Sequence, residues 1–154
     1  MGVSSKLMNA ETIAITGGCH CGGIQYRLSW PVSAQQIPAR SCSCSYCTRF
    51  AATWTSHPEA RLNVMFGTRD QEVRYRFGTQ TADFIFCRGC GLLCLAISRI
   101  DEHDYAVVNI NTFSPQDIIP LDHSKSDFSG EQTTDRLTRR KRRWISTVYC
   151  QFSV

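Results

Sequence analysis

The sequence predicts a mainly β fold, built from small antiparallel sheets with a short helix near the C-terminus. Three observations support this prediction. Apolar and polar residues alternate in several short segments, which is typical of half-buried strands. Glycine and proline residues separate these segments, as they do at turns. Seven of the nine cysteines fall into three tight clusters, which is typical of a fold organised around bound metal.

The first two strands are predicted by a period of two near the start of the chain. Residues 11–16 alternate around Ile13 and Ile15. Residues 23–30 place four apolar side chains on one face of a strand and three polar side chains on the other. The four apolar residues are Ile24, Tyr26, Leu28 and Trp30. Each segment therefore predicts a strand with one buried face.

The middle of the chain predicts four further strands. Residues 72–77 alternate, with Val73, Tyr75 and Phe77 on one side. Three more segments are continuously apolar, which predicts strands that are buried on both faces. These segments are residues 83–86, 92–98 and 105–110.

A helix is predicted in the basic C-terminal segment, residues 134–145. Thr134 or Asp135 could cap its N-terminus. The apolar residues would share one side of this helix, at spacings of seven and eight, and the basic residues would line the exposed side. The apolar residues are Leu137, Trp144 and Ile145, and the basic ones are Arg139, Arg140, Lys141, Arg142 and Arg143.

Length and composition indicate a single domain. The 154 residues are enough for one core, and we expect a flexible N-terminus, residues 1–10, followed by the domain, residues 11–154. No run of about 18 apolar residues is present, so no membrane-spanning helix is expected. Residues 1–10 lack the apolar stretch of a signal peptide. We therefore expect the protein in the reducing cytoplasm, without a membrane partner.

The formal net charge of +4 is concentrated in one place. Five of the 17 basic residues lie in residues 139–143, and the other twelve nearly balance the 13 acidic residues. Nucleic-acid binding would therefore depend on this one segment. An exposed helix face explains the segment more simply, so a nucleic-acid partner is not expected.

The cysteine clusters point to two zinc sites. The clusters are Cys19-His20-Cys21, Cys42-Ser43-Cys44-Ser45-Tyr46-Cys47 and Cys87-Arg88-Gly89-Cys90. The first and last together supply four thiolates, enough for one closed tetrahedral site, and their flanking glycines permit the backbone to curl around a metal. The central cluster supplies only three thiolates, which leaves one position for water or a substrate.

Spacing alone leaves alternatives open. The clusters could pair in another combination, form one polynuclear site or hold structural zinc only. Disulfides would need an oxidising compartment and fit an odd number of cysteines poorly, and iron–sulfur runs usually have other spacings. Cys94, within an apolar strand, and Cys150, near the terminus, are not expected to be ligands.

The motifs occur in a characteristic order. Gly-Cys-His-Cys-Gly-Gly precedes a predicted strand, Cys-Ser-Cys-Ser-Tyr-Cys follows, and Tyr-Arg-Phe-Gly-Thr leads into Phe-Cys-Arg-Gly-Cys-Gly. This combination resembles the glutathione-dependent formaldehyde-activating enzyme family, which also includes the centromere protein V domain. The resemblance covers residues 16–113.

The resemblance implies an Mss4-like fold of small antiparallel β-sheets organised around zinc. It implies a zinc-dependent carbon–sulfur lyase that joins glutathione to formaldehyde or a related small aldehyde, giving S-hydroxymethylglutathione in the formaldehyde case. It also implies two zinc ions per chain. The structural ion would be bound by Cys19, Cys21, Cys87 and Cys90, and the labile or catalytic ion by Cys42, Cys44 and Cys47.

The residues themselves suggest how such a site would act. A free thiol is a poor nucleophile because its pKa is about 8.5, and zinc deprotonates a coordinated thiol. We therefore expect the open site to carry the substrate thiol. Arg49 and Arg88, next to the clusters in sequence, could bind glutathione carboxylates, or each could be a solvated surface residue.

Two further possibilities concern partners. The competing function is a non-catalytic zinc module that binds protein or nucleic acid. Exposed alternating strands could also pair two copies of the chain into a homodimer.

Overall fold

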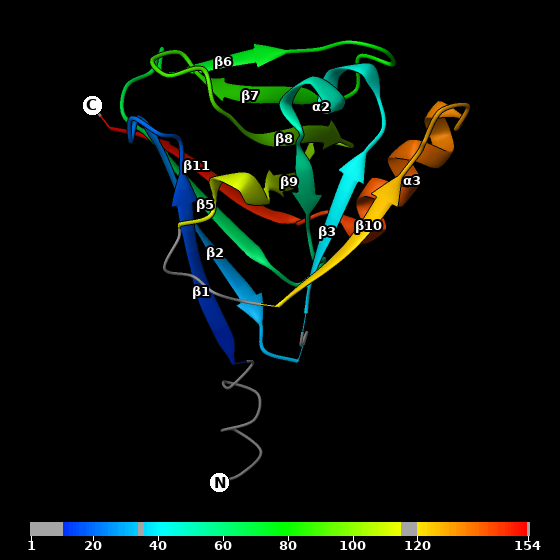
Figure 1. The fold of residues 1–154 in the computed structure, drawn as a ribbon, viewed down its shortest axis with the longest axis horizontal. Helices are drawn as coiled ribbons and strands as arrows, with labels where there is room; N and C mark the ends of the chain where they lie inside the picture. The colour runs from blue at the N-terminus through cyan, green and yellow to red at the C-terminus, as the bar shows by residue number, and fades with distance from the viewer. Residues whose placement is uncertain (1–10, 34–35, 115–119, 154) are drawn as a thin grey trace, which may run out of the picture.

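The computed structural model describes residues 11–33, 36–114 and 120–153. It confirms a mainly β fold with antiparallel-rich sheets and a short C-terminal helix (Figure 1). The N-terminus predicted to be flexible, residues 1–10, lies outside the described residues. Within the described part of the chain, no helix is long and apolar enough to cross a membrane.

The first sheet contains four strands in the order β1-β2-β5-β11. These are β1 (Thr12–Gly18), β2 (Ile24–Pro31), β5 (Arg61–Phe66) and β11 (Thr147–Phe152). β2 pairs antiparallel with β1 and β5, whereas β11 pairs parallel with β5. The alternation predicted for β2 is confirmed, because its four apolar residues are all buried.

The second sheet contains seven strands in the order β10-β3-β4-β9-β8-β7-β6. In chain order they are β3 (Ile37–Cys42), β4 (Thr53–Thr55), β6 (Glu72–Tyr75), β7 (Asp83–Cys87), β8 (Leu93–Ile100), β9 (His103–Asn109) and β10 (Leu121–Ser126). All neighbours are antiparallel except β10 and β3, which are parallel. β6 is an edge strand, and Tyr75 on it is 46% exposed.

Apolar packing holds the two sheets together. One core contains residues of both sheets, among them Leu28 and Phe66 of the first and Ile85 and Leu95 of the second. A smaller core contains Trp54, Leu93, Ala96 and Val107 of the second sheet, with Cys47 and Trp144 from its helical cover. Because β8 contributes to both cores, its continuously apolar sequence is explained by burial on both faces, as predicted.

Three helical segments accompany the sheets: α2 (Ser45–Phe50), the 3-10 helix η1 (Ile110–Thr112) and α3 (Thr133–Arg143). The predicted caps of α3 are wrong, since the helix begins at Thr133 and its N-cap is Gln132, which makes no side-chain cap hydrogen bond. The helix ends at Arg143 and not at residue 145, so Trp144 and Ile145 are buried, as expected, but lie just beyond the helix and not on its side.

The basic side of α3 is not wholly exposed, contrary to the prediction. Arg140 is only 7% exposed. Its Nη1 donates to the Thr81 carbonyl at 3.2 Å, to Thr81 Oγ1 at 2.8 Å and to Ser98 Oγ at 3.0 Å. The helix therefore docks on the second sheet partly through a buried, hydrogen-bonded arginine, which an apolar periodicity cannot reveal.

Candidate metal centres and the adjoining cavity

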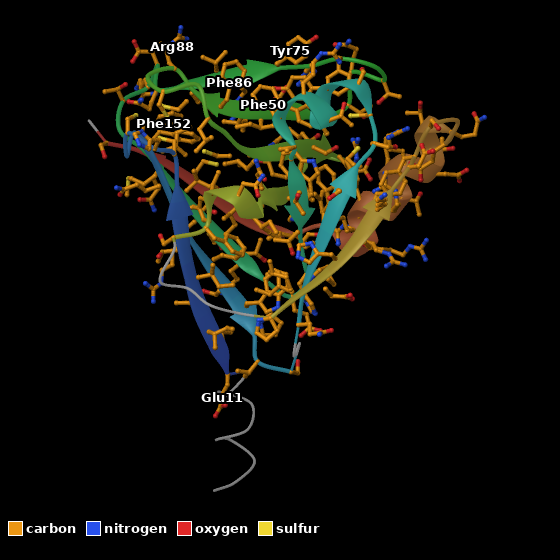
Figure 2. The ribbon with its side chains drawn as sticks, in the orientation of Figure 1. Glu11, Phe50, Tyr75, Phe86, Arg88 and Phe152 are labelled. Carbon is orange, nitrogen blue, oxygen red and sulfur yellow. The ribbon has the colours of Figure 1, made fainter. Side chains whose placement is uncertain are left out.

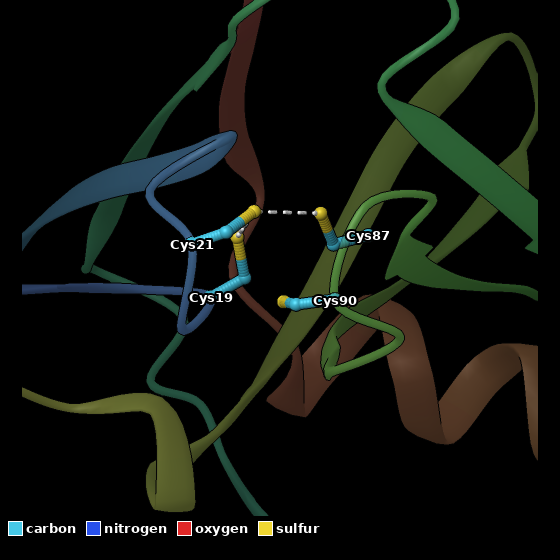
Figure 3. A group of neighbouring side chains, drawn as sticks. All are labelled: Cys19, Cys21, Cys87 and Cys90. Atoms are coloured by element: carbon cyan, nitrogen blue, oxygen red, sulfur yellow. Dashed lines mark hydrogen bonds between the residues drawn. The ribbon is translucent and has the colours of Figure 1, made fainter.

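Four cysteines, here called the quartet, converge from two turns that are distant in sequence. Cys19 and Cys21 lie between β1 and β2, and Cys87 and Cys90 lie at the turn between β7 and β8 (Figure 3). The four sulfur atoms all lie within 4.8 Å of one another. Cys19 Sγ is 3.7 Å from Cys21 Sγ, which is 3.5 Å from Cys87 Sγ. The quartet therefore joins the first sheet to the second.

Local backbone geometry places these sulfur atoms. Gly22 and Gly91, each just after a cysteine of the quartet, have φ angles of 84° and 78°, in the left-handed region that glycine adopts without strain. In these turns, backbone N–H groups donate hydrogen bonds to the cysteine sulfur atoms. Ile24 N donates to Cys19 Sγ at 3.2 Å, and Gly89 N donates to Cys87 Sγ at the same distance.

Burial and hydrogen bonding act in opposite directions on these thiols. Burial raises the pKa of Cys19 to about 12. Burial also acts to raise the pKa of Cys87, but hydrogen bonds from the Cys90 backbone, the Gln71 amide and other neighbours outweigh it and bring the pKa to about 6. Gln71 Nε2 lies 3.3 Å from Cys87 Sγ. The turns thus already favour negative charge on sulfur at one position.

The quartet fits a tetrahedral zinc ion. A Zn–S distance of about 2.3 Å places the sulfur atoms of such a site about 3.8 Å apart, close to the distances found here. All nine cysteines lie among the described residues, and all are free thiols, so cross-linking does not compete with metal binding. Four thiolates complete the coordination of zinc and leave no position for a substrate.

The other three cysteines, here called the trio, gather where β3 ends and α2 begins. Cys42 is the last residue of β3, Cys44 is the N-cap of α2, and Cys47 lies in its first turn. Their sulfur atoms also lie within 4.8 Å of one another. Among the described residues, no fourth histidine, cysteine or carboxylate joins them. The trio could therefore bind a metal with one position left for another ligand.

Neighbouring groups hold the trio in place. Cys47 N donates to Cys44 Sγ, and Trp54 Nε1 donates to Cys47 Sγ, both at 3.3 Å. Hydrogen bonding from the Cys47 thiol is the largest cause that lowers the pKa of Cys42, to about 5, and the charge of Arg136 contributes. The same hydrogen bond, together with burial, raises the pKa of Cys47. One thiolate is thus favoured within the trio.

A cavity of about 450 Å³ opens beside the trio, within the range of about 300–1,000 Å³ for small-molecule sites. Its apolar wall includes Trp54, Phe77, Phe84, Val107 and Trp144, and its basic wall consists of Arg40, Arg136, Arg139 and Arg140. The trio lines this cavity, whereas none of the quartet cysteines does. Only the trio therefore borders the cavity, whereas Cys21 and Cys90 of the quartet are exposed at the surface.

The two arginines chosen from sequence lie elsewhere. Arg49 donates to the Ser45 carbonyl within α2, and Arg88 donates to the Asp70 carbonyl at 2.7 Å. Figure 2 shows Arg88 beside the β6–β7 end of the molecule, far from α3. Neither lines the cavity, and their role in glutathione binding stays a prediction.

The three arginines of α3 that line the cavity could have been predicted from their spacing in the sequence. Arg136, Arg139 and Arg140 are three and four residues apart, so a helix carries them on a single face. The interpretation of residues 139–143 as a solvated run missed this face. In the structure, Arg139 pairs with Glu131, Arg140 is buried and Lys141 pairs with Asp101, which weakens the nucleic-acid alternative.

Fold and site together define a small, mainly β protein with two cysteine sites suited to metal, one of them open to a cavity. The family model for the glutathione-dependent formaldehyde-activating enzyme matches residues 14–125, and the chain belongs to this family. Among solved structures, a crystal structure of a Rhodobacter sphaeroides protein is 28% identical in sequence. The match covers 70% of this chain and 99% of that chain, with a TM-score of 0.48.

Proposed function

We propose that this protein is a zinc-dependent enzyme of carbon–sulfur lyase type, which joins glutathione to formaldehyde or a related small aldehyde. Family membership supports this proposal. The observation that carries it is the unequal placement of the cysteines: the trio lines a cavity and the quartet does not. The nine free thiols are in keeping with a reducing compartment such as the cytoplasm.

The donor sets suit two zinc ions with different roles. The quartet would hold one ion that links the two sheets and contributes to folding. The trio would hold the second, whose positive charge would stabilise an incoming thiol as thiolate. In the overall reaction a carbon–sulfur bond forms between the glutathione sulfur and the aldehyde carbon, and the thiol proton ends on the aldehyde oxygen.

The protein's own side chains would prepare this addition. Trp54 Nε1 and the Cys47 backbone N–H fix the directions of two trio sulfur atoms. Trp54, Phe84 and Trp144 give the cavity an apolar wall that reduces the water around a bound thiol and aldehyde. Holding both reactants in one cavity converts a bimolecular step into an effectively unimolecular one.

The test measures formation of S-hydroxymethylglutathione from ¹³C-formaldehyde and glutathione by exchange NMR, because the uncatalysed reaction is also visible there. The zinc-loaded protein should accelerate exchange, and Cys44→Ser should bring the rate back to the uncatalysed value. Cys150→Ser is the matched control, since Cys150 lies on β11 outside both clusters. A folded Cys44→Ser protein with the full rate of the parent would refute the proposal.

A further inference from the structure

Four arginines form one wall of the cavity beside the trio. Arg40 comes from β3, and Arg136, Arg139 and Arg140 come from α3. The family model matches residues 14–125, so α3 lies beyond the matched segment. Three of the four arginines of this wall therefore lie outside the matched segment.

Arg139 is already neutralised. Its Nε and Nη2 donate to the two carboxylate oxygens of Glu131 at 3.1 and 3.0 Å. Its guanidinium carbon lies 3.6 Å from the centre of the Phe128 ring. Arg139 therefore holds Glu131 and Phe128 at the edge of the cavity, and its charge is not available to a ligand.

Arg136 and Arg140 still have hydrogen-bonding capacity. Among the residues that the structure describes, the Nε atoms of both are buried and have no hydrogen-bond partner. The Nη2 of Arg136 donates to the Phe128 carbonyl at 3.0 Å, and its Nη1 is 3.8 Å from Glu131. An unpaired buried donor is costly, so these two guanidinium groups, whose side chains both line the cavity, are incompletely satisfied by the protein and would gain from an acceptor that a ligand supplies.

The charges around the cavity are also unbalanced. Four guanidinium groups line it, and two carboxylates lie nearby. Glu131 pairs with Arg139 at 3.0 Å and with Arg136 at 3.8 Å, and Asp127 accepts hydrogen bonds from Ser129 at 2.7 and 3.0 Å. Burial, then repulsion from Arg136 and Arg139, lowers the pKa of Arg140 to about 10. An anionic ligand would relieve this repulsion.

We infer that Arg136 and Arg140, with Arg40, form a carboxylate-binding subsite, which restricts the enzyme to thiols that carry a carboxylate. This inference rests on the proposed function, because it concerns the thiol substrate of the same cavity. Guanidinium groups match carboxylates in geometry as well as in charge. Since the trio and these arginines line one cavity, a single ligand can place its sulfur at the trio and its carboxylate at α3.

The kinetic test compares glutathione with its diethyl ester, which keeps the thiol and lacks both carboxylates. For the parent protein the ester should have a KM at least about tenfold higher, as expected for loss of a charged hydrogen bond. Arg136→Gln should raise the KM of glutathione by a similar factor with little change in kcat. In this variant the KM values of glutathione and of its diethyl ester should therefore be similar. Arg142→Gln is the matched control, because Arg142 is exposed on the same helix.

A binding test separates this inference from the proposed function. S-methylglutathione has a blocked thiol, so its binding to the zinc-loaded protein needs no catalysis. NMR titration should show that it binds more tightly than its diethyl ester, and that Arg136→Gln removes the difference while Arg142→Gln keeps it. That result supports the subsite even for a protein without lyase activity. Equal affinities for acid and ester in the parent protein would overturn the subsite and leave the lyase proposal untouched.

A second variant tests the subsite in case Arg136→Gln does not fold. Arg40→Gln approaches the same subsite from β3, where Arg40 Nη2 donates to Ser56 Oγ at 2.7 Å, and Ser56 Oγ in turn donates to the carbonyl of Arg143 at the end of α3. It should weaken S-methylglutathione binding in the same direction as Arg136→Gln. Full retention of affinity in both folded variants would overturn the inference.

Discussion

At the residue scale, the trio depends on one hydrogen-bond donor from outside it. Trp54 is 6% exposed and directs Nε1 at Cys47 Sγ. Groups that hydrogen-bond to metal ligands orient them and tune their affinity, and their loss typically lowers metal affinity by about 10–100-fold. A tryptophan at this position is therefore more than a piece of the apolar wall.

Trp54→Phe should lower the zinc affinity of the trio by about 10–100-fold, because phenylalanine keeps most of the packing but has no donor. Competition with a chromophoric chelator measures this affinity. Trp30→Phe is the matched control: Trp30 is fully buried, and its Nε1 has no hydrogen-bond partner among the described residues. Equal loss of zinc in both variants would show that packing, and not the hydrogen bond, supports the trio.

The two cysteine sites should respond differently to loss of one ligand. Cys87→Ser should lower the melting temperature strongly, because the quartet joins the two sheets and metal binding contributes to folding. Cys42→Ser should shift it far less, since the trio lies within one local segment, residues 42–47. Thermal unfolding followed by circular dichroism, with zinc content measured in parallel, makes the comparison. Similar melting temperatures for both variants would contradict the division of roles.

Residues of the cysteine sites could be predicted because their spacing is local. A CxC, a CxxC and a three-cysteine cluster show in the sequence which neighbouring thiols lie close together, whereas the pairing of the first cluster with the last is left open by spacing and is implied by the family resemblance. The structure groups the thiols into four and three. The donor Trp54 and the wall residue Arg136 could not be predicted in the same way. Their positions depend on how β4 and α3 pack against distant segments.

At the element scale, α3 is anchored by opposite kinds of contact. Trp144, just after its last turn, belongs to the smaller apolar core. Arg140 makes three hydrogen bonds to Thr81 and Ser98, and its guanidinium carbon lies 4.9 Å from the centre of the Trp144 ring. The helix therefore needs both an apolar and a charged residue to close the cavity.

Arg140→Met should lower the free energy of unfolding by about 2 kcal/mol, because it removes hydrogen bonds made by a charged group in a buried place. Urea denaturation measures this value. Arg142→Met, at an exposed position of α3, should change it by less than about 0.5 kcal/mol. If the two substitutions had equal effects, Arg140 would not be the anchor of α3.

Elements were predictable to different degrees. β2 and β8 could be predicted from their sequence patterns. The alternation in β2 indicates burial on one face, and the continuously apolar sequence of β8 indicates burial on both faces. The parallel pairings of β10 with β3 and of β11 with β5 are not recorded by any local pattern, because pairing direction depends on the path of the whole chain. The prediction of antiparallel sheets therefore holds for most neighbours and not for these two pairs.

At the scale of the whole molecule, metal should leave the two sites in separate steps. The trio lines a cavity and has three protein ligands, whereas the quartet has four and joins the two sheets. A strong chelator should therefore remove about one zinc quickly without unfolding, and the second slowly together with loss of β structure. Glutathione should accelerate only the first step, because its thiol competes at the open site.

Zinc release measured by absorbance, with circular dichroism recorded on the same sample, follows both steps. S-methylglutathione is the control, because it would fill the cavity without offering a thiolate to the metal, and it should not accelerate the first step. Release of both ions in one step, coincident with unfolding, would mean that the trio is as structural as the quartet. Release in two steps, with glutathione accelerating only the first, would instead link the trio to the binding of substrate sulfur. Only a ligand that reaches the metal can change the rate at which that metal is released.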